Sequence, residues 1–232
     1  MRKLVDGITF CGFALLAARC LVCRERGGER SDLCPDCRAS LPWNDRACLR
    51  CGLPMATATT ICGACLRHPP PFAVTQAVFR YGFPLDRLLP RFKFHADLAA
   101  GALIAELALP RLSRAERPQL LVPVPLHRRR LRERGYDQAL ELAKALSRPL
   151  QLPLAVALLH RRAATVAQSR LDAPGRRRNV RGAFVCSPGP LPAHVALVDD
   201  VMTTGATVRE CALALRRAGV GRVDVWVIAR AS

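Results

Sequence analysis

Four pairs of cysteines constrain this chain more than any other feature. Each pair reads Cys-x-x-Cys, and the pairs form two segments of the pattern C-x2-C-x10-C-x2-C, offset by 28 residues from 20 to 48. This spacing is typical of an internally duplicated zinc ribbon, in which two such turns bring four thiolates to one tetrahedral ion. We therefore predict about two structural zinc ions, held by Cys20, Cys23, Cys34, Cys37, Cys48, Cys51, Cys62 and Cys65.

The spacing leaves the pairing of the cysteines open. Either each segment binds its own ion, or the first pair joins the third in a crossed arrangement. A single Cys-x-x-Cys is also a redox motif, but four in a fixed register favour metal. We predict that Cys11, Cys186 and Cys211, which lack partner spacing, are buried thiols, and that the nearby His68 is a surface residue.

The chain is strongly basic, with 36 Lys and Arg against 18 Asp and Glu and a formal net charge of +18. Only three of the basic residues are lysines. One interpretation is an anionic partner such as nucleic acid. The alternative is an arginine-rich composition without functional meaning, and charge alone does not choose between them.

The N-terminus resembles a targeting signal, because basic residues precede an apolar stretch from Ile8 to Ala18. Asp6 interrupts its start, and the stretch is far shorter than the ~20 residues of a membrane span. We therefore expect a short amphipathic helix packed on the protein, and no membrane span. A cytoplasmic location with reduced thiols follows as an expectation.

From about residue 72 the paired cysteines end, and apolar strand-like segments alternate with helical ones. Alternation of this kind predicts an α/β fold with a mostly parallel sheet and helices on both faces. We therefore divide the chain into a zinc-ribbon domain with its N-terminal helix, residues 1–70, and an α/β domain, residues 71–232. Strands are predicted at 72–82, 119–125, 154–159, 194–201 and 222–230, and helices before Pro110, at 135–147 and at 207–219.

The stretch VALVDDVMTTGATV, residues 195–208, places two carboxylates at the end of a buried strand. A threonine- and glycine-rich turn and a helix follow, at the position where open α/β sheets bind ligands. Backbone N–H groups, hydroxyls and a helix N-terminus suit a phosphate, whereas carboxylates accept hydrogen bonds from a sugar diol. The pattern predicts a ligand that carries both groups. It is neither a Walker A loop nor a dinucleotide fingerprint.

This stretch resembles the phosphoribosyl diphosphate motif of type I phosphoribosyltransferases. Two further blocks, VPVPLHRRRLRERGYDQ at 122–138 and RRRNVRGAF at 176–184, together with the cysteine segment, make the chain similar to the ComF family (ComFC type) over nearly its whole length. The resemblance implies that Asp199 and Asp200 are catalytic residues that hold the ribose. It implies a phosphate loop formed by Thr203, Thr204, Gly205, Ala206 and Thr207.

The resemblance also implies roles for the basic segments. A loop with His127, Arg128, Arg129 and Arg130 would grip the pyrophosphate, although a solvated arginine run is the alternative. The segment 161–182 would cover the site, and magnesium would bridge diphosphate and ribose oxygens. Asp137 departs from the family pattern, which usually has Asn there.

Two functions remain open at this point. The first is a magnesium-dependent phosphoribosyltransferase, a glycosyltransferase that releases pyrophosphate, linked to DNA uptake and natural transformation, with an acceptor that the sequence does not identify. Its support is the intact diacid and threonine turn. The alternative is a non-catalytic competence factor that binds single-stranded DNA and a DNA helicase of the uptake machinery. Its support is the charge and the cysteine segment.

Overall fold

The computed structural model describes residues 19–28, 31–56, 60–162 and 180–231. The expected N-terminal helix, Cys11 and most of the segment 161–182 lie outside these ranges. The chain divides into two compact units, of which the larger begins at Pro42, whereas the change in composition lies near residue 70. None of the helices in the described ranges has the length and apolar character needed to cross a membrane.

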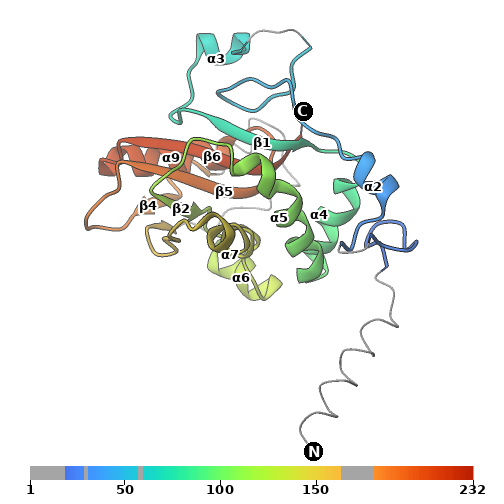
Figure 1. The fold of residues 1–232 in the computed structure, drawn as a ribbon. Helices are drawn as coiled ribbons and strands as arrows, with labels where there is room; N and C mark the ends of the chain where they lie inside the picture. Colours follow the sequence, from blue (N-terminus) through green and yellow to red (C-terminus); the bar gives the residue numbers. More distant parts are fainter. Residues whose placement is uncertain (1–18, 29–30, 57–59, 163–179, 232) are drawn as a thin grey trace, which may run out of the picture. The chain divides into compact units, whose positions relative to one another are not determined.

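A four-stranded parallel sheet forms the centre of the larger unit (Figure 1). Its strand order is β1-β6-β5-β2, and every neighbouring pair is parallel. The strands are β1 (Thr75–Arg80), β2 (Leu120–Pro123), β5 (His194–Met202) and β6 (Arg222–Arg230). Parallel strands end at the same edge, so the carboxyl ends of β2 and β5 lie side by side.

Helices cover both faces of this sheet, as the sequence predicts. On one face α9 packs against β5 and β6, beside the antiparallel pair of β3 and β4, and on the other face α5 and α7 pack against the strands. The bounds are α4 (Leu85–Phe94), α5 (Leu98–Leu112), α6 (Arg128–Arg134), α7 (Gln138–Leu150), α9 (Ala206–Ala218), β3 (Leu159–Arg161) and β4 (Phe184–Cys186). Helix α9 ends at Gly219, whose left-handed backbone closes it as expected.

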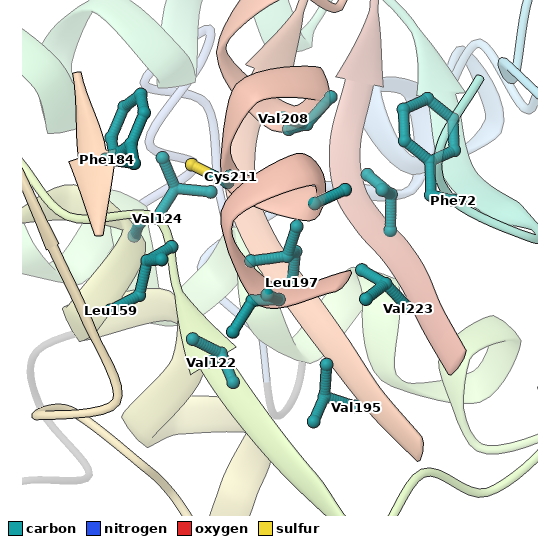
Figure 2. Close-up of a cluster of buried hydrophobic side chains, with 14 of the residues drawn as sticks. Phe72, Val122, Val124, Leu159, Phe184, Val195, Leu197, Val208, Cys211 and Val223 are labelled. Carbon is teal, nitrogen blue, oxygen red and sulfur yellow. The ribbon is translucent and has the colours of Figure 1, made fainter. Parts of the chain in front are cut away.

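From Val195 to Val198 strand β5 is apolar on both faces because both faces are covered. Val195 and Leu197 point toward α9, where they meet Val208 and Cys211 in a buried apolar cluster (Figure 2). Each fully buried Val or Leu side chain contributes about 1.5–3 kcal/mol relative to an exposed one. Cys211 is fully buried, as predicted for an unpaired thiol, whereas Cys186, which was predicted to be buried, is only partly buried at the end of β4.

Three local expectations are wrong or incomplete. The strand predicted at 154–159 begins only at Leu159, because Leu154 makes a single parallel bridge to Leu121 before the chain turns. Helix α5 continues past Pro110 to Leu112. Helices α4 and α6 and strand β4 were not predicted from the sequence.

Candidate functional site

The structure gathers the eight paired cysteines into two groups of four, and within each group all sulfur atoms lie within 4.8 Å of one another. The first ribbon holds Cys20, Cys23, Cys34 and Cys37, and the second holds Cys48, Cys51, Cys62 and Cys65. The Sγ atoms of Cys23 and Cys34 are 3.6 Å apart, and those of Cys51 and Cys62 are 3.7 Å apart. Sulfurs bound to tetrahedral zinc at about 2.3 Å are roughly 3.8 Å apart, so both groups fit the ion. The two structural zinc sites are confirmed, and the pairing is sequential.

The duplication extends to the backbone of the two ribbons. The third cysteine of each occupies the N-cap position of a five-residue helix, α2 (Pro35–Ala39) or α3 (Gly63–Arg67). A left-handed residue stands at the same place in each, Arg24 with φ 67° and Gly52 with φ 66°. Equivalent hydrogen bonds join Cys20 N to Glu25 O and Cys48 N to Leu53 O, and Leu21 N to Asp32 O and Leu49 N to Thr60 O.

Backbone N–H groups favour the thiolate form of the first cysteine in each ribbon. Burial opposes ionisation of Cys20, but N–H groups that include those of Cys23 and Cys34 outweigh it and lower the pKa of Cys20 to about 6. The same balance lowers the pKa of Cys48 to about 7. Zinc binds the thiolate, so these N–H groups favour the binding form. His68 is exposed and stands outside the group of ligands, as predicted.

The second ribbon is hydrogen-bonded to the sheet. Thr75, the first residue of β1, donates its backbone N–H to Leu49 O at 2.8 Å and its hydroxyl to Arg50 O at 2.6 Å. The side chain of Asn44 donates to Gly52 O at 2.9 Å. A Cβ atom on Gly52 would lie 2.8 Å from the Cβ of Ala77, so only glycine fits there. The second ribbon therefore belongs to the larger unit.

A cavity of about 110 Å³ lies at the carboxyl ends of β2 and β5. We call it the diacid pocket. It is lined by the predicted Asp199 and Asp200, the whole turn Thr203–Thr207, here called the threonine loop, and Arg130. The charged and amide side chains that join them are Lys93, Arg134, Asp137, Gln138 and Arg161. Sequence elements far apart along the chain thus meet where α/β sheets bind ligands.

The two carboxylates of the pocket differ in charge state. Lys93 Nζ on α4 lies 3.0 Å from Asp200 Oδ2. Burial opposes ionisation of Asp200, but the Lys93 ammonium outweighs it and lowers the pKa of that carboxyl. Burial and the adjacent Asp200 carboxylate raise the pKa of Asp199 to about 8. The surroundings of the pair therefore favour the ionised form of Asp200 and the protonated form of Asp199.

The threonine loop is shaped by Gly205. Its φ is +74°, and a Cβ atom there would lie 2.5 Å from Met202 Cε. Helix α9 begins directly after it and aims its N-terminal N–H groups at the pocket. Ala206 N donates to Thr204 Oγ1 at 3.4 Å, and within the described ranges no protein acceptor is found for the N–H groups of Thr203 and Thr204. Such a loop can bind an anion with its backbone.

The basic segment after β2 is only partly directed at the pocket. His127 caps α6 by accepting a hydrogen bond from Arg129 N at 3.2 Å. Arg128 and Arg129 are exposed, and Arg129 pairs with Glu133. Of the four predicted residues, Arg130 lines the pocket, and His127, Arg128 and Arg129 do not.

Asp137 stabilises the backbone of the basic segment after β2. Its Oδ2 accepts from Leu126 N at 2.8 Å and its Oδ1 from Leu140 N at 3.2 Å, so it joins the end of β2 to the start of α7. An Asn has a single side-chain acceptor oxygen and would make only one of these bonds. Burial raises the pKa of Asp137. Asp137, which departs from the family pattern, therefore has a structural role.

Sequence reasoning missed Lys93 and Arg134 as pocket residues, and it included Arg161 only as the first residue of the segment 161–182 expected to cover the site. Lys93 carried a signal, because it is one of three lysines among 36 basic residues. Arg134 carried none in an arginine-rich chain. Arg134 stacks on the ring of Phe94 and donates to Gln138 Oε1 at 2.8 Å, contacts that need the folded chain.

Comparison with known proteins covers both the ribbons and the sheet. The double zinc ribbon domain family matches residues 13–66. Competence protein F of Haemophilus influenzae is 35% identical over 226 residues, which is 92% of this chain and 97% of that protein. DNA utilization protein YhgH of Escherichia coli K12 is 34% identical over 204 residues, 85% of this chain and 90% of that protein. Competence protein ComFC of Bacillus subtilis is 27% identical over 196 residues, 81% of this chain and 79% of that protein.

Proposed function

The chain belongs to the ComF family, and from that premise we propose that it binds phosphoribosyl diphosphate in the diacid pocket and transfers the phosphoribosyl group in the service of DNA uptake and utilization. The observation that carries the proposal is the joining of Asp199, Asp200 and the threonine loop in one cavity at the end of β5. We place this activity in the cytoplasm, where the cysteines stay reduced.

Each part of the ligand has a chemically matched partner. The carboxylates of Asp199 and Asp200 accept hydrogen bonds from the ribose hydroxyls, and the N–H groups and hydroxyls of the threonine loop donate to the 5′-phosphate. Arg130 and Arg134 stand at the pocket wall and supply positive charge for the diphosphate. Lys93 keeps Asp200 ionised and so available as an acceptor.

Magnesium fits the donor set, because hard carboxylate oxygens are the ligands it takes together with phosphate oxygens. Asp199 and Asp200 would hold it in the pocket, where it would neutralise charge on the diphosphate. Binding in this form requires Asp199 to lose its proton.

The reaction follows from this placement. A nitrogen nucleophile forms a bond to the anomeric carbon, the bond from that carbon to the diphosphate oxygen breaks, and pyrophosphate leaves with the electron pair. The nucleophile then loses its proton to solvent. The transition state resembles an oxocarbenium ion, so the residues act by positioning and by charge, and no side chain is needed as a general base.

Calorimetric titration with phosphoribosyl diphosphate and magnesium tests the proposal. Replacing both carboxylates, Asp199→Asn with Asp200→Asn, keeps the shape and removes the charged acceptors. We expect affinity to fall about 100-fold or more, because each charge-assisted bond contributes about 1.5 kcal/mol or more. Glu141→Gln is the matched control, since Glu141 is ion-paired with Lys144 outside the pocket. Equal affinity in the double variant would refute the assignment.

A second candidate function is binding of single-stranded DNA, with a DNA helicase as the further partner. Arg128 and Arg132 are exposed on α6, and neither has an ion-pair partner in the described structure. Each phosphate contact contributes a slope of about −0.7 to the dependence of log affinity on log salt. Arg128→Ala with Arg132→Ala should therefore flatten the slope for an oligothymidylate by about 1.4. An unchanged slope excludes this surface.

A further inference from the structure

Arg230 joins the second ribbon to the end of β5. It is the last residue of β6 and is 8% exposed. Its Nε donates to Cys51 O at 3.1 Å, and its Nη1 donates to Met202 O at 3.1 Å and also to Ala231 O. One guanidinium thus binds the backbone of a zinc ligand and the last residue of the strand that carries the diacid.

Met202 links the Arg230 contact to the threonine loop. It is the residue directly before Thr203, and its carbonyl also accepts from Ala231 N at 3.0 Å. The Cε atom of Met202 occupies the space beside Gly205, where a Cβ would come within 2.5 Å. The position of Met202 therefore sets where the loop begins and how closely its glycine turn approaches.

A cavity of about 500 Å³ is lined by the second ribbon, the threonine loop and Arg230. Its lining includes Cys51, Leu53, Cys62 and Cys65 from the ribbon, and Met202, Thr204, Gly205 and Ala206 from the loop. Because side chains do not fill this space, packing across it transmits little force. The hydrogen bonds of Arg230 make the direct connection.

Charge strengthens the same connection. A four-thiolate zinc site carries a formal charge of −2, and the buried guanidinium of Arg230 stands beside it. Zinc holds the four cysteines in one geometry and so fixes the Cys51 carbonyl that Arg230 binds. Loss of the ion would free that carbonyl and the guanidinium together.

We propose that Arg230 is a positioning residue that couples the zinc of the second ribbon to anion binding in the threonine loop. The inference rests on the proposed function, because it takes the loop to be the phosphate site. Coupling between two sites is reciprocal, so a ligand in the loop also retains the zinc.

Zinc release to a chromogenic chelator, with and without phosphoribosyl diphosphate and magnesium, measures this coupling. In the unmodified protein, saturating ligand should slow the release of one of the two zinc ions by about 5- to 10-fold. In Arg230→Leu the ligand should leave both release rates unchanged. Arg230→Lys keeps the charge, but one ammonium does not match the guanidinium fork with its three carbonyl contacts, so it should give an intermediate protection.

Arg216→Leu is the matched control. Arg216 also donates to two backbone carbonyls, those of Val220 and Gly221, but at the opposite end of β6. It should keep the protection seen in the unmodified protein, whereas a general loss of stability would weaken both variants. Calorimetry on the same sample separates failure of the coupling from failure of the proposed function. Binding without zinc protection, or full protection in Arg230→Leu, overturns the coupling alone, and absence of binding overturns the proposed function with it.

Discussion

In the first ribbon the left-handed position after the second cysteine is Arg24, which is exposed, whereas in the second ribbon it is Gly52, which packs against Thr75 and Ala77 of β1. The two ribbons share their ligand spacing, their turns and their backbone hydrogen bonds. They differ in what surrounds them. One copy of the duplicated zinc module thus lies in the smaller unit, and the other is part of the larger unit that contains the sheet.

The difference assigns separate roles to the two zinc ions. The ion of the first ribbon stabilises the unit that ends at Leu41. The ion of the second ribbon stabilises a segment that accepts hydrogen bonds from β1 and β6. Loss of the second ion should therefore destabilise the sheet, and loss of the first should not.

Removing one ligand from each ribbon should give the largest contrast. Cys51→Ser should lose one zinc ion and lower the urea midpoint of the larger unit markedly, because metal-binding free energy is folding free energy in such sites. Cys23→Ser should also lose one ion but leave that midpoint in place. Trp43 and Trp226 both lie in the larger unit, so tryptophan fluorescence reports on it alone. Equal shifts of this urea midpoint in the two variants would show that the two ribbons contribute equally to the stability of the larger unit.

Substituting the left-handed residue of each ribbon should give a smaller difference in the free energy of unfolding. Gly52→Ala places a Cβ 2.8 Å from that of Ala77 in a backbone conformation that disfavours it. We expect a cost of about 2–4 kcal/mol, from about 1 kcal/mol of backbone strain and 1–3 kcal/mol of overpacking. Arg24→Gly should change stability by about 1 kcal/mol or less, because Arg24 is exposed. Urea titration of the zinc-loaded proteins checks both, and a mild effect of Gly52→Ala contradicts the packing.

The smallest expected effect concerns one hydroxyl between β1 and the second ribbon. Thr75→Val keeps the side-chain shape and removes the donor to Arg50 O. We expect a loss of about 1 kcal/mol in the unfolding free energy of the larger unit. Thr60→Val, at a threonine of the second ribbon that is exposed, is the control. If the two variants are equally stable, this bond does not help to attach the ribbon.

The sequence predicted the parts whose signal is local. Eight cysteines at fixed spacing predicted two zinc sites, and the apolar run before Asp199 predicted β5 and the turn after it. The pairing of the cysteines stayed open, because C-x10-C separations allow both arrangements until the chain is folded.

The contacts that complete the site are not local, and the sequence did not predict them. Lys93 and Asp200 are far apart along the chain and meet only because α4 packs near the end of β5. Arg230 looks like one more arginine at the end of a strand, and only its bonds to Cys51 and Met202 distinguish it. Long-range ion pairs and buried arginines depend on topology, which periodicity along one segment does not encode.

The pH dependence of phosphoribosyl diphosphate binding tests the diacid pocket most directly. Burial and the neighbouring Asp200 raise the pKa of Asp199 to about 8, and the proposed binding of the ligand with magnesium requires the ionised form. Affinity should therefore rise by up to tenfold for each pH unit from about pH 6 to pH 8 and level off above, with about one proton released on binding at pH 7. In Asp199→Asn the residual affinity should not follow this rise. Binding by the unmodified protein that is independent of pH over this range, with no proton released, would contradict the account.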